Sequence, residues 1–104
     1  MPEAGRRQLQ KILDQKHQIA SNDEEIRATE QETNEVVRDQ ERIRQNITSL
    51  NNVNGQQEQV QTYSRQLAAQ EKQLATLRDR LSELRKKKTT LEVSVRSLID
   101  QLEL

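Results

Sequence analysis

Residues 60–102 read VQTYSRQLAAQEKQLATLRDRLSELRKKKTTLEVSVRSLIDQL, and their apolar side chains recur at alternating steps of three and four residues. With Val60 at heptad position a, the a and d positions are Val60, Tyr63, Leu67, Gln70, Leu74, Leu77, Leu81, Leu84, Lys88, Leu91, Val95, Leu98 and Leu102. An unbroken repeat of about 3.5 residues over this length is typical of a coiled coil. The stretch therefore predicts one long helix that needs a partner helix.

The preceding half of the chain carries a weaker repeat of the same kind. Its best register places Ile12, Ile19, Ile26, Thr33, Gln40 and Ile47 at a, and Gln8, Gln15, Asn22, Thr29, Val36, Ile43 and Leu50 at d. Between the halves lies Asn51-Asn52-Val53-Asn54-Gly55-Gln56, in which Asn54-Gly55 is a strong turn signal because both residues tolerate a left-handed backbone. We therefore expect a helix over about 6–50, a turn over about 51–57 and a helix over about 58–103, as a single unit covering residues 1–104.

A chain that folds back at Gly55 pairs the a positions of one helix with the d positions of the other. Facing residue numbers then add up to 110, so that Leu50 meets Val60 and Ile43 meets Leu67. The polar core positions also meet, with Gln40 facing Gln70 and Asn22 facing Lys88. One buried polar layer can fix the register of a coiled coil. The sequence predicts an all-α fold, an antiparallel two-helix coiled-coil hairpin.

The charges beside the predicted seam separate this hairpin from a parallel dimer. An antiparallel pair brings e positions to e positions and g positions to g positions. Five of the resulting pairs are of opposite charge: Lys16 with Glu92, Asp23 with Arg85, Glu30 with Arg78, Glu25 with Lys87, and Glu32 with Arg80. A sixth pair, Leu9 with Ile99, is apolar, and no pair joins like charges. A parallel dimer would instead oppose like charges, such as Glu25 to Glu30. Each exposed pair contributes only about 0.2–1 kcal/mol, so the pattern selects topology more than it stabilises it.

The composition argues against several classes of protein. Charged residues make up 33% of the chain, the only aromatic is Tyr63, and there is no Cys, Trp or Phe. Such polarity is compatible with intrinsic disorder, but the many strong helix formers and the regular apolar spacing oppose that alternative. The formal net charge is zero, which removes the attraction expected of a protein that binds nucleic acid or an anionic membrane. We expect neither nucleic acid nor a membrane as a partner.

Few residues are candidates for chemistry. His17 is the only histidine and falls at an f position, where it should face solvent without another His or Cys to complete a metal site. No phosphate-binding loop or catalytic motif is visible, so we expect no enzyme activity, no cofactor, no metal and no small-molecule ligand. The basic run 85–88 could contact nucleic acid, although Asp23-Glu24-Glu25 is expected to lie across from it and neutralise it.

One region suggests a protein partner. Far from the turn, the second helix is apolar where the first carries Gln, Asn and Thr, so we expect a slight rotation of the first helix that lets these polar side chains reach water. The candidate interaction surface then consists of Leu77, Leu81, Leu84, Leu91, Val95, Leu98 and Leu102. Additional apolar surface near the same end comes from Leu9, Leu13, Val93, Ile99 and Leu104. Fraying of a loosely packed end is the plainer reading. The sharper one is a homodimer, a four-helix bundle, or contact with other domains of a parent protein.

A family resemblance extends these expectations. The stretch 39–47, DQERIRQNI, is followed by Leu50, Tyr63, Leu67, Gln70-Glu71, Leu74 and Leu77-Arg78. Over roughly residues 6–104 the chain resembles the C-terminal coiled-coil region of a large bacterial family of unknown function. Those proteins are similar to the mucoidy-inhibitor-A-like class and carry a β-rich domain before a helical hairpin. The resemblance implies a segment of a longer protein and brings no catalytic residue.

Two functions remain open from the sequence. The first is a non-catalytic structural or interaction module, a rigid arm that spaces domains or mediates self-association. The alternative is a nucleic-acid-binding helical arm, which is similar only in architecture to the helical arm of seryl-tRNA synthetases. An unpaired basic stripe on one face would favour the alternative.

Overall fold

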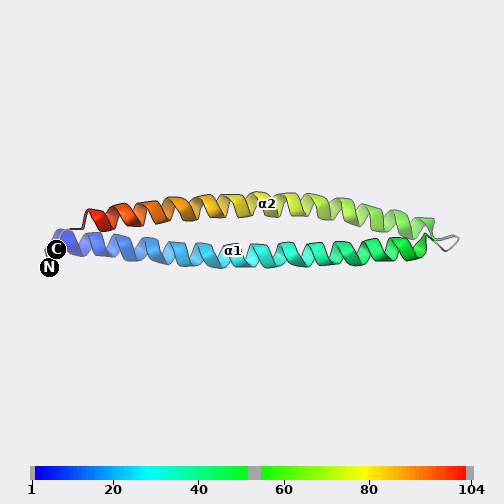
Figure 1. Ribbon diagram of the computed structural model, residues 1–104, viewed down its shortest axis with the longest axis horizontal. Helices are drawn as coiled ribbons and strands as arrows, with labels where there is room; N and C mark the ends of the chain where they lie inside the picture. The colour runs from blue at the N-terminus through cyan, green and yellow to red at the C-terminus, as the bar shows by residue number, and fades with distance from the viewer. Residues whose placement is uncertain (1, 52–54, 103–104) are drawn as a thin grey trace. The chain divides into compact units, whose positions relative to one another are not determined.

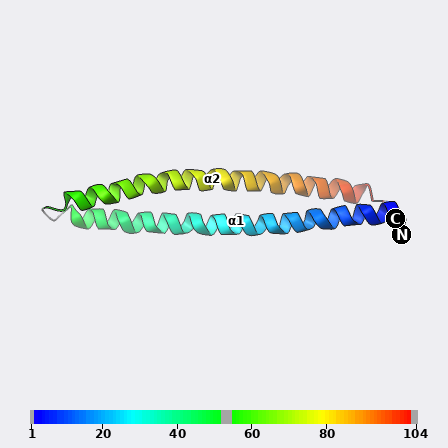
Figure 2. The ribbon, with the colours of Figure 1, turned by 180° about the vertical axis from the view of Figure 1, so that it is seen from behind.

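The protein consists of two long helices. The structure, a computed structural model, describes residues 2–51 and 55–102. Helix α1 spans Glu3–Leu50 and helix α2 spans Gln57–Asp100, which confirms the predicted all-α helical hairpin. The chain forms two compact units, unit 1 with Met1–Ala28 and Leu81–Leu104, and unit 2 with Thr29–Arg80. Each unit contains a segment of α1 beside a segment of α2 that runs in the opposite direction (Figures 1 and 2).

The helix ends follow from local chemistry. α1 begins at Glu3, slightly before the expected start near residue 6, because the Pro2 carbonyl accepts a hydrogen bond from the Arg6 amide at 3.1 Å. Glu3 also places an acidic side chain at the positive end of the helix dipole. α2 ends at Asp100. The expected end near residue 103 and the predicted turn residue Asn54 lie outside the described residues.

Gly55 precedes α2 and has the backbone conformation that the turn signal predicted. Its φ angle is +86°, in the left-handed region where a Cβ atom is unfavourable. A Cβ built at this position would meet no heavy atom within 4 Å, so the backbone angle alone calls for glycine. Gly55 therefore has a backbone angle that suits its place in the predicted turn.

Unit 2 is held together by an apolar cluster between the two helices. Val36 of α1 packs with Leu74 and Leu77 of α2. Ile43 and Leu74 are the most deeply buried side chains, with 1% and 2% of their surface exposed. Burying each such side chain contributes about 1.5–3 kcal/mol relative to leaving it in water.

Unit 1 has a core of mixed character. Ile12, Leu84 and Val95 are buried in it, and so is the polar Asn22. The Gln8 side chain donates a hydrogen bond from Nε2 to the Gln101 carbonyl at 3.0 Å. The first turns of α1 therefore lie beside the C-terminal end of α2.

The predicted heptad register is confirmed in both helices. Every a and d position from Gln8 to Leu50 and from Val60 to Leu102 is buried or half-buried. His17, at its f position, is exposed as expected. The a and d positions thus form the seam between α1 and α2 within each unit.

Candidate interaction surface

The seven predicted interaction residues line the seam of the hairpin. Leu77 of unit 2 and Leu84 and Val95 of unit 1 are buried. The other four are half-buried: Leu81, Leu91, Leu98 and Leu102. These side chains pack toward α1 within their own units and leave only their edges at the surface.

The expected rotation of the first helix is wrong. Asn22 and Thr29 at d positions are only 3% and 4% exposed, so their polar groups do not reach water. Asn22 instead donates a hydrogen bond from Nδ2 to the Leu84 carbonyl at 2.8 Å. A helical carbonyl oxygen has a second lone pair for such a bond, which makes burial of the amide tolerable without rotation.

The polar layer around Asn22 differs from the prediction in its partners. The heptad register pairs Asn22 with Lys88, and Asp23 with Arg85. In the structure the Lys88 ammonium group lies 2.9 Å from the Asp23 carboxylate, because its long side chain extends from the seam to the edge of α1. The Asp23 carboxylate accepts a hydrogen bond from Lys88 and raises the pKa of that amine above its usual range. Lys88 is therefore paired with the acidic segment of α1.

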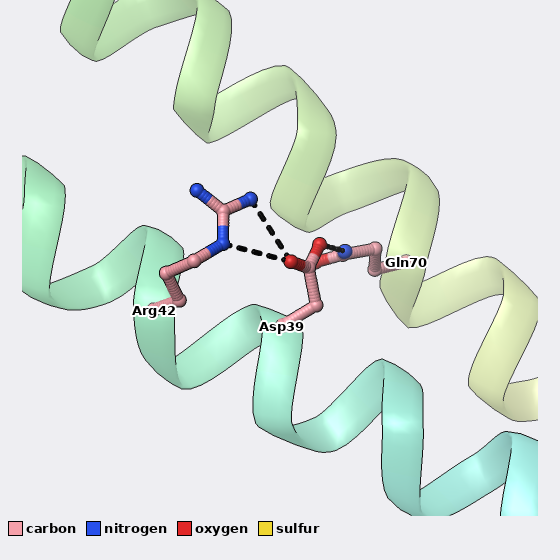
Figure 3. A network of polar contacts seen from close by, with 3 residues as sticks. All are labelled: Asp39, Arg42 and Gln70. Atoms are coloured by element: carbon pink, nitrogen blue, oxygen red, sulfur yellow. Dashed lines mark hydrogen bonds and ion pairs between the residues drawn. The ribbon is translucent and has the colours of Figure 1, made fainter.

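Unit 2 contains a second polar layer, drawn in part in Figure 3. Gln70 donates from Nε2 to Asp39 Oδ2 at 2.6 Å, and Gln40 donates from Nε2 to Glu71 Oε1 at 2.9 Å. The predicted Gln40–Gln70 layer thus exists, but each amide donates to the carboxylate next to the opposite glutamine. Hydrogen bonds to a charged acceptor are stronger than those between neutral amides, which accounts for the outward bonds.

Asp39 is the centre of that layer. Arg42 approaches Asp39 Oδ1 at 2.9 Å from both Nε and Nη2, and Gln70 binds the other carboxylate oxygen (Figure 3). The hydrogen bonds from Arg42, and then from Gln70, hold the pKa of the Asp39 carboxyl below its usual range. The network links α1 to α2 through a single carboxylate.

A groove across both helices is the feature of unit 1 that the sequence prediction did not identify. It has a volume of about 540 Å³ and is lined by Lys16, Ile19, Ala20, Asp23, Glu92, Val95, Arg96 and Ile99. Apart from the a residues Ile19 and Val95, all of these are at e or b positions. The e and b positions of unit 1 form one side of the helix pair, which we call the e face. The g and c positions form the opposite side, the g face.

The two faces of unit 1 differ in polarity. Ile99 at an e position and Leu13 at a b position are 48% and 50% exposed, and both belong to the e face. The described side chains of the g face in unit 1 are polar, apart from Ala4 and Ala28. Val93, the remaining large apolar side chain exposed in this unit, is at an f position away from both faces. The sequence signal for the e face was the predicted pair of apolar e residues, Leu9 and Ile99.

Neither helix provides features for other kinds of site within the described residues. No group of three or more His, Asp or Glu side chains is placed to hold a metal ion in residues 2–51 and 55–102. Over the same ranges, neither α1 nor α2 has an apolar stretch long enough to cross a bilayer. Comparisons with protein-family models, curated proteins and solved structures found no match.

Proposed function

We propose that this chain is a non-catalytic helical-hairpin module that binds protein through the e face of unit 1. The observation that carries the proposal is the position of Leu13 and Ile99, two exposed apolar side chains on the same face as the groove. Exposed apolar side chains that gather beside a groove are typical of protein-binding surfaces. The polar g face offers no comparable surface.

The module projects from its parent protein as an arm and does not connect two domains end to end. The hydrogen bond from Gln8 to Gln101 brings the start of α1 to the end of α2. Any domain attached before α1 and any domain attached after α2 would leave from the same end of unit 1. The hairpin would then project from its parent protein, in keeping with the resemblance to a bacterial family with a β-rich domain before a helical hairpin.

Site-specific photo-crosslinking in the source organism tests the binding face. A photoreactive amino acid at Leu13, on the e face, is compared with one at Asp14, its neighbour on the g face. Both positions are exposed, so that the probe leaves the seam intact. We expect discrete protein adducts from position 13 and few from position 14. Equal labelling from both positions, or no adduct from either, would contradict the proposal.

A further inference from the structure

The groove of unit 1 carries a balanced set of charges on both of its walls. α1 contributes Lys16 and Asp23, and α2 contributes Glu92 and Arg96. Among the residues that the structure describes, no ion pair engages Lys16 or Arg96. A partner that fits this groove must offer both signs of charge in matching order, together with an apolar side chain for Ile99. A uniformly acidic or basic partner would meet repulsion at two of the four charged positions.

We propose that the occupant of the groove is the same groove of a second copy of this chain. The inference rests on the proposed function, because it names the partner for the same face. Two copies would stack e face to e face, with a twofold axis parallel to the helices, and would form a four-helix bundle. This packing differs from association through the leucines of the seam, which are already packed toward α1.

The order of residues on the e face is complementary to itself in this arrangement. The twofold axis places α1 of one copy against α2 of the other, antiparallel and at the same level. Lys16 and Glu92 line the same groove, and the heptad register places them at one level within unit 1. Lys16 would then lie opposite the second copy's Glu92, and Leu9 opposite the second copy's Ile99. The symmetry repeats each contact, so that both charges and both apolar side chains are matched twice.

The polar g face limits the assembly to two copies. A second apolar face on the far side of each hairpin would let further copies add to the stack. In unit 1 the described g and c positions carry side chains such as Lys11, Gln18 and Thr90, which remain in water. An interface confined to one face closes after a single twofold operation.

Light scattering across a concentration series measures the association directly. The chain has a mass of 12.2 kDa, and we expect the wild type to reach twice that mass at micromolar concentrations. Ala20→Arg places a long charged side chain in the groove from an exposed position, and should raise the dimer dissociation constant at least tenfold. Ala28→Arg is the matched control, because Ala28 is an exposed alanine of α1 on the g face. It should change the dissociation constant less than twofold.

A charge exchange tests the pairing itself. Lys16→Glu should weaken the dimer about tenfold, since it opposes the second copy's Glu92. Mixing Lys16→Glu chains with Glu92→Lys chains should instead give mixed dimers whose dissociation constant is within about threefold of the wild type, because each pair between the chains then joins opposite charges while the pairs within each chain stay alike. Circular dichroism of every variant confirms that the helices remain folded, which separates lost association from lost structure.

Several results would contradict a dimer formed through the e face. A folded wild type that stays at 12.2 kDa to high micromolar concentration would exclude the second copy, as would a mass above the dimer. Equal weakening by Ala20→Arg and Ala28→Arg would place the interface elsewhere. A monomeric chain that still forms adducts with other proteins from position 13 would refute this inference and leave the proposed function standing.

Discussion

Asn22 donates a hydrogen bond from its side-chain Nδ2 to the backbone carbonyl of Leu84 at 2.8 Å, joining α1 to α2 inside unit 1. The other end of the same amide, Oδ1, is buried without a partner among the described residues. An unsatisfied buried acceptor costs about 1–3 kcal/mol. The bond to the Leu84 carbonyl satisfies the amide nitrogen but leaves this oxygen uncompensated. We therefore expect Asn22 to lower the stability of the seam.

Replacing this residue should raise stability. We expect Asn22→Leu to increase the free energy of unfolding by about 1 kcal/mol, since it removes the unsatisfied acceptor and adds apolar contact in the seam. Urea unfolding followed by circular dichroism measures the change. Asn34→Leu is the control, because Asn34 is exposed and the substitution should leave the free energy within about 0.5 kcal/mol. A clear loss of stability in Asn22→Leu would mean that the hydrogen bond to Leu84 outweighs the unsatisfied oxygen.

The Asp39 layer makes stability depend on pH in the acidic range. The pKa of Asp39 is lowered in the folded chain by hydrogen bonds from Arg42 and Gln70, so folding favours the charged carboxylate. This contribution is fully present above the ordinary pKa of about 3.8 and is lost as the pH falls through the lower folded value. We expect the urea midpoint of the wild type to fall more steeply below pH 3.8 than that of Asp39→Asn.

A second carboxylate of α1 provides the control for Asp39→Asn. Glu35→Gln neutralises an exposed side chain of α1 in the same unit, and should leave the acid dependence close to that of the wild type. Asn at position 39 retains an oxygen that can accept from Gln70, so the variant tests the charge rather than the whole network. Identical pH profiles for Asp39→Asn and the wild type would show that the charge of Asp39 adds nothing to stability.

The sequence predicted the seam because apolar spacing alone determines which side chains a helix pair buries. Every a and d position was assigned correctly, including the polar ones such as Gln40 and Asn22. It did not predict the polar partners. The heptad register gives the level at which two backbone positions face each other. It does not show how far a long side chain extends along the seam, and Lys88 extends from its own level to the carboxylate of Asp23.

The candidate interaction surface was also predicted only in part, because its position depends on a contact between one side chain and the backbone of the other helix. The sequence indicated excess apolar side chains at the end far from the turn, but took the row of leucines in the seam as the candidate surface and named Leu13 and Ile99 only as additional apolar surface. Burial of Asn22 keeps α1 facing that row, so the exposed apolar surface lies at e and b positions, with Ile99 and Leu13. Whether the first helix rotates depends on a hydrogen bond to a backbone carbonyl, which no side-chain pattern encodes.

The basic run 85–88 should not bind nucleic acid at physiological salt. Lys88 is paired with Asp23, and Arg85 also has an interaction within the described residues. With a net charge of zero, the chain gains little from releasing counterions. We expect no binding of duplex DNA or single-stranded RNA below about 100 μM at ~150 mM salt, measured by fluorescence anisotropy. Micromolar binding with a steep salt dependence, abolished by Lys86→Glu with Lys87→Glu, would favour the nucleic-acid arm instead.

The contact between Val36 and Leu74 offers a test of the fold in solution. Both residues belong to the apolar cluster of unit 2, and the chain has no native cysteine to compete. Val36→Cys with Leu74→Cys should form a disulfide within one chain under mild oxidation. A non-reducing gel separates this product from a crosslinked pair of chains. Moving one cysteine to the exposed position Val37 provides the control and should slow the reaction markedly.

The cysteines introduced at positions 36 and 74 also test the role of Gly55. They show whether Gly55 favours a hairpin within one chain over an exchange of α2 between two chains. Gly55 has a φ angle of +86° with open space around its missing Cβ, so Gly55→Ala adds backbone strain and no steric clash. We expect a loss of about 1 kcal/mol in the free energy of unfolding. Gly55→Asn should lose less, since asparagine tolerates the left-handed region better than alanine does.

The strain at position 55 should also affect whether α2 packs against α1 of its own chain or against α1 of a second chain. Extending both helices through position 55 removes the left-handed angle, and two extended chains can then exchange α2 while keeping the same seam contacts. The fraction of disulfides between positions 36 and 74 that join two chains should therefore rise from wild type to Gly55→Asn to Gly55→Ala, with unchanged helical content. An interchain fraction that is equal in all three backgrounds would mean that Gly55 does not determine the hairpin, and that the pairing of the seam alone selects it.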